Sequence, residues 1–106
     1  DDFTVLPLLA VGGVGVISVV SNILPAKMAG LCAAYFKGDM KKAQALNIEL
    51  QAISRAMFLE TNPIPVKTAL SLMKRCKPDL RLPLAPLTAA NMEPLKATLK
   101  KYKLIK

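Results

Sequence analysis

The spacing of apolar residues predicts that this chain is mostly helical. The clearest element is a long amphipathic helix that opens at Asp39, because its apolar positions recur every three or four residues, as on a helix that packs against another. These positions are Ala43, Leu46, Leu50, Ile53 and Met57. A second helix begins at Pro25 and stops at Gly38, with buried positions at the same spacing. These are Met28, Leu31, Cys32 and Tyr35.

Two more helices are expected in the C-terminal half. One begins at Pro65, runs through residue 77 and is closed by Pro78. The other begins at Thr88 or Asn91 and runs to about Lys103. Between them, residues 80–87 are expected to be an extended segment that lies across the helices. Their prolines exclude a central strand.

A short helix is expected over residues 3–11, before a left-handed exit at Gly12-Gly13. Either Asp2 or Thr4 would serve as its N-cap. Asp1 and Asp2 are adjacent, so their side chains diverge on a helix or strand and do not form an acid–base pair. Helix capping is therefore the favoured interpretation of these carboxylates.

Residues 14–20 are predicted to form the one strand. They are apolar and mostly β-branched, which is typical of a strand buried on both faces of a parallel sheet. The backbone donors and acceptors of such a strand need neighbouring strands, and no second segment of this chain has the pattern of one. We therefore expect it to be the last strand of a sheet whose other strands lie outside the chain.

The net charge of +8 is unevenly distributed over the 106 residues. Residues 1–36 carry a net charge of −1, whereas residues 37–106 carry +9. A basic half would suit nucleic acid or an acidic membrane surface. However, the lysines are spread over several helices, and no aromatic platform for RNA accompanies them. They are best interpreted as solvated helix faces, with neither nucleic acid nor membrane as a partner.

Residues 3–26 carry no charge and would be long enough to cross a bilayer as a helix. Pro7, the glycine cluster at residues 12–15 and the Ser21-Asn22 pair break them into a helix, a turn and a strand, each too short to span. The initial Asp-Asp is unlike a signal peptide, and there is no initiator methionine, so the first residue is interpreted as a cut point. A cytoplasmic protein is expected.

The two cysteines, Cys32 and Cys76, are far apart and both lie inside helical patterns. A single disulfide stays open as an alternative, but buried free thiols of a cytosolic protein are favoured. Because the chain has no histidine and only two isolated cysteines, a zinc site is excluded. No metal or cofactor is expected.

The sequence contains no self-contained active site. Ser18 and Ser21 lack a histidine base for a serine triad. The glycines at residues 13–15 precede a strand, whereas a dinucleotide fingerprint would follow one. Among the lysines, Lys67 is the least implausible Schiff-base amine, but activation would need burial or a neighbouring cation. No catalytic residue is therefore assigned within the chain.

Three segments nevertheless resemble the C-terminal part of the dihydrodipicolinate synthase family of pyruvate-dependent class I aldolases. They are GVGVISV at residues 13–19, NPIPVK at 62–67 and LRLPLAPL at 80–87. The resemblance implies an α/β fold, a (β/α)₈ barrel followed by a helical domain. Since such a barrel takes about 250 residues, this chain would hold only its end. Residues 1–38 would be the last helix, strand and helix of the barrel, and residues 39–106 the C-terminal helical domain.

The resemblance also implies a function. Family members condense pyruvate with aspartate semialdehyde in the biosynthesis of diaminopimelate and lysine, through a lysine Schiff base that would lie upstream of this chain. They are cytoplasmic homotetramers without a cofactor. Ile17 would contact pyruvate, and the missing N-terminal barrel segment would be a partner. Two alternatives stay open: a sibling aldolase acting on sugar acids, and a free-standing basic helical module that binds acidic partners.

Overall fold

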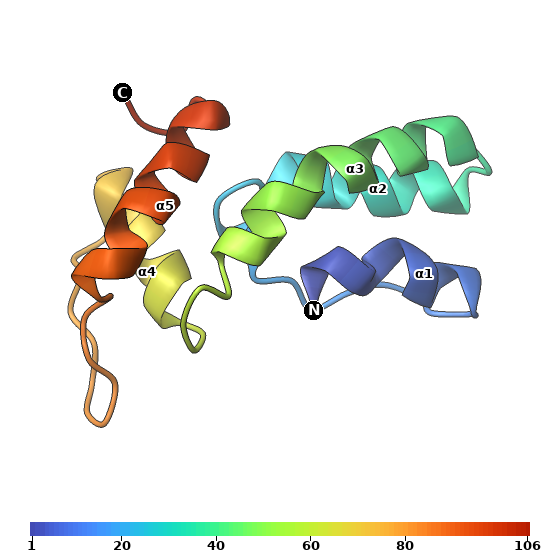
Figure 1. Cartoon of the computed structure of the whole chain (residues 1–106). Coiled ribbons are helices and arrows are strands. Elements are labelled where there is room, and N and C mark those ends of the chain that lie inside the picture. The colour runs from blue at the N-terminus through green and yellow to red at the C-terminus, as the bar shows by residue number, and fades with distance from the viewer. The chain divides into compact units, whose positions relative to one another are not determined.

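The computed structural model describes all 106 residues and contains helices but no strand (Figure 1). Two short 3₁₀ helices and five α-helices follow in order: η1 (Asp2–Thr4), α1 (Val5–Ala10), η2 (Val20–Asn22), α2 (Pro25–Phe36), α3 (Met40–Ala56), α4 (Ile64–Leu72) and α5 (Ala89–Lys101). All five predicted α-helices are present, but α4 ends at Leu72 rather than at residue 77, because Lys74 takes a left-handed backbone conformation there. The chain divides into two compact units, Asp1–Ser54 and Arg55–Lys106.

The first unit is built around α2 and α3, which lie side by side in Figure 1. The predicted apolar face of α3 is confirmed, since Ala43, Leu50 and Ile53 are almost completely buried. Lys27 on α2 pairs with Glu49 on α3 across the exposed side of this contact. The first helix is attached to α2 by Tyr35, whose hydroxyl donates to the Leu9 carbonyl at 2.8 Å.

The second unit consists of α4, α5 and the loop between them. Leu95 and Leu99, one turn apart on α5, are completely buried, as is Ala69 on α4. Residues 80–87, predicted to be extended, contain no strand, but the segment is interrupted by a turn at Leu82-Pro83, where the Leu84 N–H donates to the Arg81 carbonyl at 3.0 Å. Residues 55–106 carry eleven basic and three acidic side chains, whereas residues 1–54 carry four of each. The net positive charge of the chain therefore belongs to the second unit.

Four of the helices end with the same backbone motif. After α1, α2, α4 and α5, one residue has a left-handed backbone conformation, and its N–H and that of the next residue return to carbonyls in the last helical turn. The left-handed residues are Gly12, Gly38, Lys74 and Lys103. The ends of α1 and α2 use glycine, as the sequence predicts. The ends of α4 and α5 instead place a lysine in a backbone conformation that is strained for any residue with a side chain.

The predicted strand over residues 14–20 is wrong as an element of this structure. Residues 13–18 run as an extended segment without strand pairing, and the chain then bends into η2. The physical reason is the one that the sequence indicates: a strand is defined by hydrogen bonds to neighbours, and this chain offers none. The uncharged stretch of residues 3–26 is divided among several short elements, and none of the helices has the length and apolarity needed to cross a bilayer.

Candidate functional site

The extended segment of residues 14–17 is held at both ends by hydrogen bonds to the first two helices, to α1 at its start and to η1 at its end. At its start, the Gly13 N–H donates to the Leu8 carbonyl at 2.9 Å. A Cβ atom at residue 13 would lie 2.8 Å from the same oxygen, so only glycine fits there. At its end, residues 18–20 are bound by Asp2. Because the attachment passes from residue 8 back to residue 2, the segment runs antiparallel to α1.

Asp2 forms the firmest of these attachments. Its side chain is buried, with 3% of its surface exposed. The carboxylate accepts hydrogen bonds from the Ser18 hydroxyl, from the Val19 N–H at 3.0 Å and from the Val20 N–H at 3.3 Å. Of the two predicted N-cap residues, Thr4 does occupy the N-cap position of α1, but its side chain makes no capping bond, and Asp2 lies inside η1. Asp2 instead caps η2, because the N–H groups it binds lie at the start of that turn.

The two serines of this region are bound to each other rather than free for chemistry. The Ser21 N–H donates to the Ser18 hydroxyl oxygen at 2.8 Å, and the Ser21 hydroxyl donates to the Ser18 carbonyl at 2.8 Å. The Asn22 amide closes the turn with a bond to the Val19 carbonyl at 3.0 Å. These bonds fix the direction in which the extended segment enters the turn at η2.

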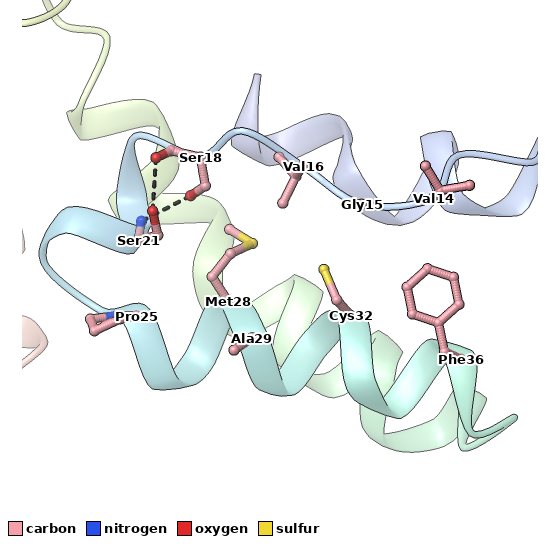
Figure 2. A pocket seen from close by; sticks show the side chains of 10 residues that line it. All are labelled: Val14, Gly15, Val16, Ser18, Ser21, Pro25, Met28, Ala29, Cys32 and Phe36. Carbon is pink, nitrogen blue, oxygen red and sulfur yellow. Dashed lines mark hydrogen bonds between the residues drawn. The ribbon is translucent and has the colours of Figure 1, made fainter.

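A cleft of about 440 Å³ lies between the extended segment and α2 (Figure 2). Its lining is mostly apolar: Val14, Gly15, Val16, Ser18, Ser21, Pro25, Met28, Ala29, Cys32 and Phe36. Figure 2 shows the Val16 side chain directed from the segment toward α2. Burial raises the pKa of the Cys32 thiol, which keeps it protonated and a poor nucleophile at neutral pH.

Ile17, the candidate pyruvate contact, does not line this cleft. Its side chain is fully exposed, and that of Val14 is 91% exposed. The backbone N–H groups of residues 14–18 make no hydrogen bond within the chain. No charged side chain is bonded to this segment except Asp2 at its end. The segment therefore presents backbone and apolar side chains but no catalytic group.

The other candidate residues lie apart from the segment. Lys67, on α4 of the second unit, is half-buried, and its amine forms no ion pair. Both cysteines are free thiols. The prediction that they are buried is wrong for Cys76, which is exposed with its Sγ 3.8 Å from the Lys67 carbonyl oxygen, while Cys32 is half-buried. No three side chains of the types that bind metals converge anywhere in the chain.

Comparison with known proteins assigns the chain to a family. Residues 1–102 match the Dihydrodipicolinate synthetase family, and the chain belongs to that family. It is 62% identical over 105 residues to the 4-hydroxy-tetrahydrodipicolinate synthase of Maridesulfovibrio salexigens. That alignment covers 99% of this chain but 36% of the relative. The chain thus spans about a third of the length of the curated relatives it matches.

Solved structures give the same assignment. The dihydrodipicolinate synthase of Thermotoga maritima is 46% identical and superposes with a TM-score of 0.95, over 99% of this chain and 36% of that one. The chloride-inhibited synthase of Acinetobacter baumannii, in complex with pyruvate, is 40% identical with a TM-score of 0.93, over 99% and 36% of the two chains. The helices described above are therefore similar to those in about one third of each of these solved synthase chains.

Proposed function

We propose that this chain is the C-terminal third of a 4-hydroxy-tetrahydrodipicolinate synthase, a lyase that condenses pyruvate with aspartate semialdehyde in diaminopimelate and lysine biosynthesis. The observation that carries the proposal is the 62% identity to a curated synthase across nearly the whole chain. The pyruvate complex of the Acinetobacter relative supports pyruvate as one substrate.

In this proposal, the extended segment is the last strand of a (β/α)₈ barrel. Residues 1–38 are the end of the barrel, and residues 39–106 form the C-terminal helical domain. The unpaired backbone N–H groups of residues 14–18 support this, because a strand between two others would use them. The fully exposed Ile17 would face pyruvate near the carboxyl end of the strand, where such barrels hold their substrates.

The catalytic chemistry is assigned to residues outside this chain. A lysine elsewhere in the barrel would form an imine with pyruvate, and the derived enamine would attack the semialdehyde. The lysines of the first unit do not suit this role, since Lys27 is paired with Glu49 and the other three lie beyond the end of α2 or at the start of α3. The working protein is proposed to be a cytoplasmic homotetramer that needs neither metal nor cofactor.

The proposal is tested with a full-length protein that carries this chain. We expect it to form product from pyruvate and aspartate semialdehyde in a coupled assay, and borohydride to trap pyruvate on one of its lysines. The chain of residues 1–106 alone should show neither turnover nor trapping. Turnover by the isolated chain would contradict the assignment of the lysine, and preference for a sugar-derived aldehyde would favour a sibling aldolase.

A further inference from the structure

We infer that Asp2 is a positioning residue for the pyruvate site, because it sets the direction in which Ile17 points. The inference rests on the proposed function, in which Ile17 contacts pyruvate. Asp2 itself would touch neither substrate. It is buried and directs its carboxylate at the three residues that follow Ile17.

The contacts of Asp2 restrict rotation of the segment about its own axis. One carboxylate accepts hydrogen bonds from a side-chain hydroxyl and from two consecutive backbone N–H groups. The orientations of these three donor groups are therefore fixed together. Hydrogen bonds to a charged acceptor are stronger than those between neutral groups. The Ser18 hydroxyl oxygen is also bound by the Ser21 N–H, which prevents Ser18 from turning away.

Fixing Ser18 in this way determines the face on which Ile17 lies. Neighbouring side chains of an extended segment point to opposite sides. Val16 and Ser18 both line the cleft against α2, and Ile17 between them points away from it and is fully exposed. A slip of one residue would turn Ile17 into the cleft and present its neighbour instead. Asp2 opposes that slip.

The test is Asp2→Asn in the full-length synthase that carries this chain. An amide offers one acceptor oxygen and places an NH₂ group against a backbone donor, so at least one bond is lost. Because small misplacements of contact groups cost up to two orders of magnitude in rate, we expect kcat/KM for pyruvate to fall about ten- to a hundredfold. The KM for pyruvate should rise more than the KM for the semialdehyde.

Tyr35→Phe is the matched control. It removes one hydrogen bond that holds α1, but it leaves residues 14–20 untouched. We expect it to lower the melting temperature while leaving the KM for pyruvate unchanged. If Asp2→Asn lowers the melting temperature to the same extent and the KM for pyruvate also stays unchanged, Asp2 is only structural and the inference is overturned.

If Asp2→Asn does not fold, Ser18→Ala decides. This variant removes the hydroxyl donor and leaves two backbone bonds to Asp2, so we expect a folded protein whose KM for pyruvate rises several-fold. An unchanged KM would overturn the inference. An inactive wild type would overturn the proposed function together with this inference. An active wild type with unaffected variants would overturn the role of Asp2 alone.

Discussion

The Glu60 carboxylate accepts two hydrogen bonds from Thr88, one from its N–H at 2.9 Å and one from its hydroxyl at 2.6 Å. The Asn91 amide adds a third bond to the same oxygen at 2.9 Å. Thr88 immediately precedes α5 and makes no capping bond with its own side chain. Glu60, 28 residues earlier in the sequence, therefore stabilises the start of this helix and places it at Thr88 rather than Asn91.

The first prediction concerns pH. The hydroxyl of Thr88 and then the amide of Asn91 are the main causes that lower the pKa of Glu60. A folded-state pKa below the unfolded value means that the carboxylate stabilises the fold fully above the unfolded pKa of about 4.3, and that this contribution is lost as the pH falls through the folded pKa. We expect Glu60→Gln to lower the melting temperature at pH 7 and the difference from wild type to shrink toward pH 3.

Glu93→Gln is the control for this experiment. Glu93 is exposed on α5 and pairs only with Lys96, one turn away. Such exposed pairs contribute little to stability, so its melting temperature should stay close to that of wild type in thermal unfolding followed by circular dichroism. A deficit of Glu60→Gln that stays constant from pH 7 to pH 3 would contradict a role for the Glu60 charge.

The second prediction concerns the two lysines with left-handed backbone. Lys74 and Lys103 have φ angles of 60° and 56° at the ends of α4 and α5. A side chain in this conformation costs about 1 kcal/mol relative to glycine. We therefore expect Lys74→Gly and Lys103→Gly each to raise the free energy of unfolding by up to about 1 kcal/mol, measured by urea denaturation. Gly38→Ala, at the matching end of α2 with a φ of 77°, should lower it by a similar amount.

The helices of this protein could be predicted from the sequence because each depends on local signals. The apolar spacing of α3 determines which of its faces is buried. Ile53 lies on that face and is fully buried, whereas Ile48, which falls outside the spacing, is 72% exposed. Asp39 begins the helix, as predicted, by accepting the Lys42 N–H at 3.0 Å. Gly38 similarly determines the end of α2. The two helix-end signals depend on residues no more than five positions apart in the sequence.

The attachments made by Asp2 and Glu60 could not be predicted in the same way. Asp2 binds a hydroxyl sixteen residues later, and Glu60 binds Thr88 after an intervening helix and loop. No periodic pattern connects such partners, and a carboxylate near a helix start is more simply interpreted as a local cap. The predicted strand failed for a related reason, because no other segment of this chain pairs with it. Its apolar side chains are also not buried as predicted, since those of Val14 and Ile17 are almost fully exposed.

The third prediction concerns Ser54 on α3. Its side chain is completely buried, and its hydroxyl has no hydrogen-bond partner. An unsatisfied buried polar group costs about 1–3 kcal/mol in desolvation, so removing the hydroxyl and leaving only the methyl group of alanine should not weaken the fold. We expect Ser54→Ala to leave the free energy of unfolding unchanged or to raise it by up to about 1 kcal/mol. A loss of stability above that size in urea denaturation would reveal a partner for the hydroxyl.

The fourth prediction compares two glycines at the start of the extended segment. A Cβ atom at Gly13 would lie 2.8 Å from the Leu8 carbonyl oxygen, and this oxygen belongs to helical backbone that also accepts the Gly13 N–H. The methyl group must therefore break that bond or displace the end of α1. We expect Gly13→Ala to lower the free energy of unfolding by about 1–3 kcal/mol.

Gly15→Ala is the matched variant, two residues further along the same segment. A Cβ atom there meets nothing within 4 Å, and Gly15 has an ordinary negative or extended φ, so the methyl group should be tolerated within about 0.5 kcal/mol by residues 1–106 alone. Urea denaturation of both variants gives the comparison. If the two substitutions prove equally costly in a full-length protein, backbone from outside these residues must approach Gly15, as a neighbouring strand of a closed barrel would.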